Sequence, residues 1–184
     1  VTLRPLEQVE GRLGNVSAVA IGGEKPPAGA MEPSRLRERP TARLTPPVAA
    51  DGRVFLAEPD AHMVHAVRAD DGERLWSFVA DGPVDSPPTI HGGLCLFGST
   101  DGHVYCVTAA DGKLAWRFRA APEERQLCVM DRLESAWPVH GSVLVRDRKV
   151  YCTAGRSSHL DGGIYLYALD PQTGKVLHEA RLRS

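Results

Sequence analysis

Short apolar runs separated by turn residues dominate the chain from Thr45 onward. Val54–Leu56 and Val104–Val107 are apolar at consecutive positions, so both faces of each predicted strand are apolar. An antiparallel sheet with one solvated face alternates apolar and polar residues, whereas sheets that are apolar on both faces have to stack on one another. Asp-Gly pairs, which favour hairpin turns because glycine accepts positive φ, separate these runs. They occur at 51–52, 71–72, 81–82, 101–102, 111–112 and 161–162.

One strand–turn–strand pattern occurs three times along the chain. Ala66–Trp76, Cys106–Trp116 and Ala168–His178 share a small first residue, a glycine-containing turn and an aromatic last residue. Repeats of short strands and tight turns are typical of solenoids and propellers, in which each unit packs on its neighbours. We therefore predict an all-β fold, a β-propeller segment of about three four-stranded antiparallel blades at about 45–80, 86–120 and 138–182.

The predicted segment is an open arc and not a closed ring, because closed propellers have about four to eight blades. We expect residues 41–184 to form the repeat region. Residues 1–40 are expected to form an irregular N-terminal segment, in which Val16–Ile21 could be one strand, packed on one end of the arc. The exposed end faces would be covered by missing chain, by a partner or by residues 1–40.

Two insertions interrupt the third repeat and its lead-in, at 121–136 and 155–163. Connections in an antiparallel blade alternate between two rims, so both insertions are predicted on the rim opposite the Asp71 and Asp111 turns. Loops on a rigid scaffold often carry binding functions, although long loops are also tolerated as plain insertions at small entropic cost. Their mixed charges suit a polar peptide or protein better than a phosphate backbone. The candidate binding face consists of Arg125, Asp131, Arg132, Glu134, Arg156, His159 and Asp161.

The repeats resemble the tryptophan-docking motif of quinoprotein alcohol dehydrogenase propellers, A-x-D-x-x-T-G-K-x-x-W, and the related repeats of the lipoprotein of the outer-membrane barrel-assembly machinery. The third repeat keeps most of the motif but has His178 in place of tryptophan, and the second departs from it at Cys106, Thr108 and Asp111. The resemblance implies a quinoprotein-like propeller of a bacterial repeat protein in an extracytoplasmic compartment. It also implies structural docking residues, which are Trp76, Trp116, Gly72, Gly112 and Gly174.

The resemblance raises the question of a pyrroloquinoline quinone (PQQ) site. In the enzymes of this family the quinone lies in the central funnel, is capped by two adjacent disulfide-linked cysteines, and has a calcium ion held by Glu, Asn and Asp oxygens. This chain has no adjacent cysteine pair, and its only asparagine is Asn15. Calcium takes about six to eight oxygen ligands, and no loop here is dense in them. We expect no PQQ or calcium site in this chain; both could occur only with missing blades.

Other chemistry is weakly indicated. His62, His65, His103 and His159 fall in or beside hairpins of one rim, but no carboxylate or thiolate stands at a supporting spacing, so we assign no metal ligand. Ser157-Ser158-His159 lacks the elbow motif of a catalytic nucleophile, so we assign no catalytic residue. The four cysteines form no C-x-x-C pair, and three are expected to be small buried hydrophobes.

Composition excludes two classes of partner. The formal net charge is −1 with no basic stripe, which argues against nucleic acid. No apolar run approaches the roughly 20 residues of a membrane span. The sequence therefore predicts a non-catalytic scaffold or a protein- or ligand-binding module of a larger repeat protein, with its remaining blades or a protein as partner. The alternative is a fragment of a PQQ-dependent dehydrogenase whose quinone and calcium ligands lie outside this chain.

Overall fold

The computed structural model describes residues 43–129 and 132–184, within which Leu44–Ser184 forms one compact unit. The predicted strand at Val16–Ile21, the predicted packing of residues 1–40 and the candidate residue Asp131 lie outside the described residues. Among the described residues, no helix is long and apolar enough to cross a membrane.

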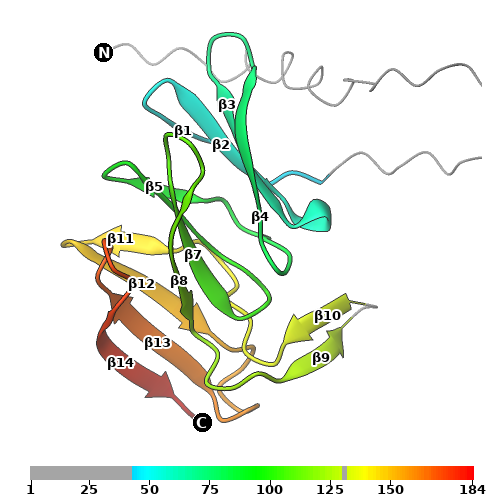
Figure 1. The fold of residues 1–184 in the computed structure, drawn as a ribbon. Helices are drawn as coiled ribbons and strands as arrows, with labels where there is room; N and C mark the ends of the chain where they lie inside the picture. Colours follow the sequence, from blue (N-terminus) through cyan, green and yellow to red (C-terminus); the bar gives the residue numbers. More distant parts are fainter. Residues whose placement is uncertain (1–42, 130–131) are drawn as a thin grey trace, which may run out of the picture. The chain divides into compact units, whose positions relative to one another are not determined.

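Three four-stranded antiparallel sheets follow one another along the chain, and in each the strands lie in chain order (Figure 1). Blade 1 contains β1 (Val48–Ala50), β2 (Arg53–Glu58), β3 (Met63–Arg68) and β4 (Arg74–Val79), with a 3₁₀ turn at Pro59–Ala61. Blade 2 contains β5 (Thr89–His91), β6 (Leu94–Gly98), β7 (His103–Thr108) and β8 (Leu114–Arg119). Blade 3 contains β11 (Leu144–Arg146), β12 (Lys149–Ala154), β13 (Ile164–Leu169) and β14 (Val176–Leu182).

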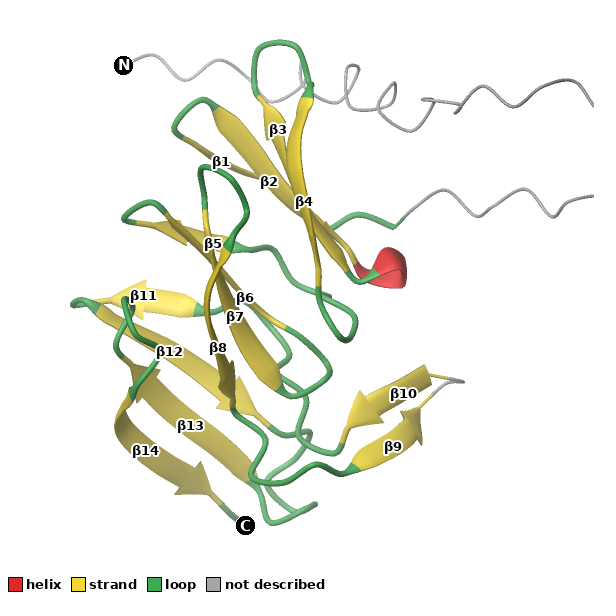
Figure 2. Cartoon of the chain, in the orientation of Figure 1, coloured by secondary structure: helices red, strands yellow, loops and turns green. Residues whose placement is uncertain are grey.

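The first insertion has structure of its own. β9 (Gln126–Val129) and β10 (Arg132–Ser135) pair with each other as a two-stranded antiparallel sheet, here called the inserted hairpin (Figure 2). This hairpin is not predicted by the sequence pattern, in which 121–136 is an insertion without a strand of its own. None of the sheets closes on itself, so the predicted all-β fold with three open four-stranded blades is confirmed.

Two apolar clusters join the blades in series. Phe55 and Val64 of blade 1 pack in one cluster with Phe97 and Val107 of blade 2. A second cluster joins the other face of blade 2 to blade 3 and contains Leu96, Val104, Val150, Tyr167 and Leu169. Blade 2 is thus covered on both faces, as its consecutive apolar positions require.

Turn glycines set the tight connections within the blades. Gly52 connects β1 to β2 at φ 70°, and Gly112 connects β7 to β8 at the same φ. Residues with a side chain rarely adopt this left-handed conformation, so the Asp-Gly pairs end one strand and start the next.

Candidate functional site

The junction between blades 1 and 2 centres on Trp76. Its side chain is buried, and its indole N–H donates to the carbonyl of Ala109 at 3.0 Å. Its ring lies directly on Gly112, where a Cβ would come within 2.7 Å of the Trp76 Cδ2 atom. The turn therefore needs glycine for two reasons, the positive φ and the approach of the indole.

The junction between blades 2 and 3 repeats this arrangement. Trp116 is buried, and its N–H donates to the carbonyl of Pro171 at 2.9 Å. Its ring covers Gly174, where a Cβ would lie 2.6 Å from Cε3 of the indole. In both junctions the accepting carbonyl belongs to the residue three positions before the turn glycine. The stabilising role of the two tryptophans stays a prediction, as does that of Gly72, which has φ 75° in the corresponding turn of blade 1.

The structure brings residues of the two insertions together. Arg125 is ion-paired with Asp161, and the Arg156 Nη2 atom lies 2.7 Å from the Glu134 Oε2 atom. Trp137 is buried, and its indole N–H donates to the Asp161 carbonyl at 2.8 Å. The Arg125 guanidinium lies 4.8 Å from the centre of the Trp137 ring, which adds a cation–π contact. Trp137 is thus anchored inward, and the two insertions form one continuous surface.

The other candidate residues lie apart from these ion pairs. Arg132 of the inserted hairpin reaches blade 1, where its Nη2 atom lies 2.6 Å from the Asp60 Oδ1 atom. His159 is exposed, and its backbone N–H donates to Ser157 Oγ at 3.2 Å. The pairing of Arg132 with Asp60 could not be predicted from the sequence, because the two residues are 72 positions apart. Whether these residues bind a partner stays a prediction.

A polar pocket of about 430 Å³ opens beside this surface. It lies between the turn that joins β6 to β7 and the link that runs from β8 into the inserted hairpin. We call it the rim pocket; it is lined by Asp81, Asp101, His103, Arg119, Ala121, Glu123, Glu124, Arg125, Gln126 and Ser135. The sequence does not predict this cavity, because nothing in the pattern brings His103 next to the charged residues of the insertion.

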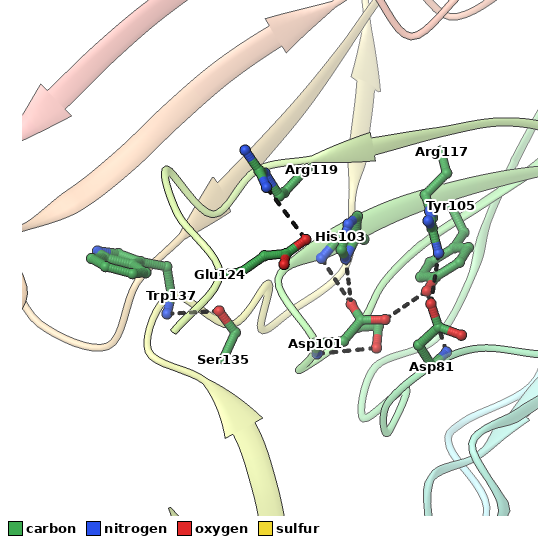
Figure 3. Close-up of polar contacts among 10 residues, drawn as sticks. Asp81, Asp101, His103, Tyr105, Arg117, Arg119, Glu124, Ser135 and Trp137 are labelled. Atoms are coloured by element: carbon green, nitrogen blue, oxygen red, sulfur yellow. Dashed lines mark hydrogen bonds and ion pairs between the residues drawn. The ribbon is translucent and has the colours of Figure 1, made fainter. Parts of the chain in front are cut away.

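Asp101 organises one wall of the rim pocket (Figure 3). Its Oδ1 atom accepts the backbone N–H of His103 at 2.8 Å and lies 3.3 Å from His103 Nδ1, and its Oδ2 atom accepts the Tyr105 hydroxyl at 2.6 Å. Burial alone would raise the pKa of Asp101, but the hydrogen bonds from His103 and Tyr105 outweigh it and hold the pKa below its usual value. The carboxylate is therefore ionised and fixes the imidazole ring in place. A partial signal was present in the sequence, because His103 and Tyr105 alternate along β7 and so share a face, and Asp101 stands in the turn just before that strand.

The same network reaches the link between blades 1 and 2. The backbone N–H of Asp81 donates to the Tyr105 hydroxyl at 3.2 Å, and Arg117 Nη1 lies 2.6 Å from the Asp81 Oδ2 atom. Burial raises the pKa of Tyr105, and the adjacent Asp101 raises it further, so the phenol stays protonated and can donate. This wall of the pocket is held by residues of the link between blades 1 and 2, of the β6–β7 turn, and of strands β7 and β8.

The described residues offer neither a cluster of metal ligands nor an adjacent cysteine pair of the kind that the quinone site requires. Among the described residues, no three His, Cys, Asp or Glu side chains are grouped so that they could hold a metal ion. His65 instead contacts Glu58 and Ser77. The four cysteines are free thiols at separate positions, so they offer no adjacent pair to cap a quinone. Burial raises the pKa of the Cys152 thiol to about 12, which makes it unreactive.

Comparison with known proteins places the chain among quinoprotein-like propellers. It is 34% identical over 87 residues to the outer membrane protein assembly factor BamB of Escherichia coli, which covers 42% of this chain and 22% of that protein. It is 29% identical over 141 residues to the dehydrogenase subunit of the quinone alcohol dehydrogenase of Gluconacetobacter polyoxogenes, covering 71% of this chain and 18% of that protein. The chain thus spans about a fifth of the length of these relatives.

A solved structure with the same fold is the quinohemoprotein alcohol dehydrogenase ADHIIG from Pseudomonas putida. It matches with a TM-score of 0.61 at 21% identity, over 73% of this chain and 20% of that one. A family model described as outer membrane protein assembly factor BamB matches residues 14–184, nearly the whole sequence. The three stacked blades and the match over almost all of the sequence show that this chain belongs to the BamB family of quinoprotein-like β-propeller proteins.

Proposed function

We propose that this chain is a non-catalytic propeller scaffold whose rim binds a polar segment of a protein partner. The observation that carries the proposal is the joining of the two insertions by Arg125 with Asp161 and by Glu134 with Arg156. Loops that are tied to a rigid scaffold hold their polar groups in fixed positions, which lowers the entropic cost of binding. The rim pocket lies directly beside these pairs and adds a concave site.

The chemistry of the rim supports binding more than catalysis. The Asp101–His103 pair fixes an imidazole, but both Asp101 oxygens already accept hydrogen bonds and no activated nucleophile lies among its contacts. The relative from Escherichia coli is named as an assembly factor, which supports a protein as the partner. An extracytoplasmic location follows from the same kinship and is part of this proposal.

The exposed outer face of blade 3 supports the presence of a further blade in the assembled protein. Leu144, Tyr151 and Leu166 are exposed on the outer face of blade 3, at the positions where blades 1 and 2 pack on the next blade. We infer that a further blade of the same repeat type covers this face. Its position matches the two existing junctions, since each of them places the corresponding face on the following sheet.

The second candidate is a fragment of a PQQ-dependent dehydrogenase whose quinone and calcium ligands lie outside this chain. The match over 71% of the chain to a quinone alcohol dehydrogenase subunit favours it. The full-length protein separates the two candidates. A dehydrogenase would show quinone absorbance and calcium-dependent dye reduction, and a scaffold would show neither.

The binding proposal can be tested by selecting random phage-displayed peptides for binding to the purified chain. Hydrogen exchange of the chain with each selected peptide then locates the binding site. We expect protection at 121–129, 132–136 and 155–163. Protection confined to the opposite rim, at the turns near Asp71 and Asp111, would contradict the proposal. Asp111→Ser serves as a control, because it changes the opposite rim and should leave peptide binding unaltered.

A further inference from the structure

Both arginines that line the rim pocket are ion-paired with carboxylates. Arg125 is paired with Asp161, and Arg119 Nη1 lies 3.5 Å from the Glu124 Oε1 atom (Figure 3). Arg117, at the edge of the pocket, is paired with Asp81. An anionic group that enters the pocket would compete with these carboxylates for the two arginines.

The acceptors of the pocket are in surplus. Four carboxylates line it, against two arginines. Glu123 is exposed and has no ion-pair partner among the described residues. Glu124 is largely exposed and shares its single pairing with Arg119 at the long distance of 3.5 Å. These two side chains leave most of their oxygen lone pairs available to a ligand.

His103 also lines the rim pocket, where its imidazole is largely buried. Its Nδ1 atom lies 3.3 Å from Asp101 Oδ1, which holds the ring in place. Asp101 itself is not offered to a ligand, because His103 and Tyr105 occupy its oxygens.

We infer that the rim pocket receives a cationic side chain, lysine or arginine, from an extended segment of the partner. This inference rests on the proposed function and names the chemistry of the partner residue. An ammonium carries three donors and a guanidinium five, with no acceptor, so each complements a pocket in which carboxylates outnumber arginines. A volume of about 430 Å³ lies at the small end of ligand pockets and accommodates one long side chain with its backbone.

Blocked tripeptides test the inference on the chain as it stands. Acetyl-Gly-Arg-Gly-amide and its Lys, Gln and Glu counterparts would be titrated into the ¹⁵N-labelled protein while backbone amide shifts are recorded. We expect the Arg and Lys peptides to shift amides at 101–103 and 119–126, and the Gln peptide to bind about tenfold more weakly, because charge-assisted hydrogen bonds are lost. The Glu peptide should not shift these amides.

A double variant, Glu123→Gln with Glu124→Gln, locates the binding. It keeps the size of both side chains, removes two negative charges and leaves Arg119 unpaired, so affinity for the Arg peptide should fall about tenfold. Glu73→Gln is the matched control, since Glu73 is an exposed, arginine-paired carboxylate in the turn of the opposite rim. It should leave the affinity unchanged.

The outcomes separate the inference from the proposed function. Failure of the Arg and Lys peptides to bind, or binding that the double variant does not weaken, overturns the inference. Binding of the Glu peptide at the same amides overturns it too, while the rim stays a binding surface. Selected phage peptides that protect only the opposite rim overturn the proposed function itself.

Discussion

The two blade junctions and the outer face of blade 3 have the same strand register, but the junctions are buried under the next sheet and the outer face of blade 3 is exposed. Trp76 pairs with Ala66 across blade 1 and Trp116 with Cys106 across blade 2, and His178 pairs with Ala168 in the same way. Both tryptophans are buried under the next sheet, whereas all seven residues of β14 are exposed. Strand formation in blade 3 therefore does not depend on a sheet covering this face, and the burial of the two tryptophans is a property of the junctions.

Apolar positions follow the same rule. Phe55 and Leu96 stand at equivalent places in blades 1 and 2 and are 1% and 0% exposed, while Tyr151 stands at that place in blade 3 and is 37% exposed. The outer face of blade 3 carries the apolar pattern of a buried face, although its residues are exposed to solvent here. Variants at the junctions and at blade 3 can separate these contributions.

The largest effect is expected for Trp116→Ala. Truncating a buried tryptophan should lower the free energy of unfolding by about 3–5 kcal/mol, because apolar area is lost and a cavity opens between blades 2 and 3. Urea unfolding followed by circular dichroism measures this. Trp76→Ala should behave alike, and His178→Ala is the control at the open position. An unchanged midpoint for Trp116→Ala would refute the docking role.

Substitutions of two turn glycines separate the stability cost of backbone strain from the cost of a clash with the indole. Gly112 and Gly52 both have φ 70°, but a Cβ at Gly112 would meet Trp76 at 2.7 Å, whereas nothing lies within 4 Å of a Cβ at Gly52. Gly52→Ala should cost about 1 kcal/mol in strain, and Gly112→Ala should cost about 1–3 kcal/mol more. Equal losses in thermal unfolding would mean that the indole does not rest on the turn.

The contribution of each rim ion pair to the free energy of unfolding should depend on how buried the pair is. Glu134→Gln leaves the partly buried Arg156 without its anion and should cost about 1–3 kcal/mol. Asp60→Asn removes the anion of Arg132, in a pair whose side chains are about half exposed, and should cost less than about 1 kcal/mol. Urea titrations of both variants at low and high salt check the order. A reversed order would show that burial does not decide the strength of these pairs.

Lowering the pH should reduce the stability that the Asp101 hydrogen-bond network contributes. The folded pKa of Asp101 lies below its unfolded value, so the stability it contributes is present above the unfolded pKa and is lost as pH falls through the folded pKa. Between about pH 5 and pH 3, the wild type should lose more stability than Asp101→Asn, whose side chain does not titrate. Parallel pH profiles of the two proteins would contradict this role.

The smallest effect is expected for His178→Trp. With no sheet over β14 in the described structure, the new indole has little apolar surface to bury, and the change in stability should stay within about 0.5 kcal/mol. Thermal unfolding of the chain checks this. A gain as large as the loss in Trp116→Ala would mean that blade 3 alone can seat an indole.

The fold could be predicted from the sequence because its signals are local. Asp-Gly turns and strands with apolar residues on both faces recur with each blade, and neither depends on distant residues. The meeting of the two insertions followed from the alternation of connections. Three features could not be predicted from the sequence: the inserted hairpin, the pairing of Arg132 with Asp60, and the rim pocket. They depend on the path of residues 121–126 through space, which no local pattern determines. Only the shared face of His103 and Tyr105 on β7 could have been predicted from the sequence.

The inserted hairpin has a consequence for how this array comes apart. In a series of repeats, each unit feels only its neighbours, so such arrays can unravel from an end one unit at a time. Here β10 is ion-paired with blade 1 through Arg132 and Asp60, and with the β12–β13 loop of blade 3 through Glu134 and Arg156. Loss of either outer blade therefore also releases a tether on the other. Because the tether to blade 1 is an exposed charge pair, ionic strength should tune whether the three blades melt together or in turn.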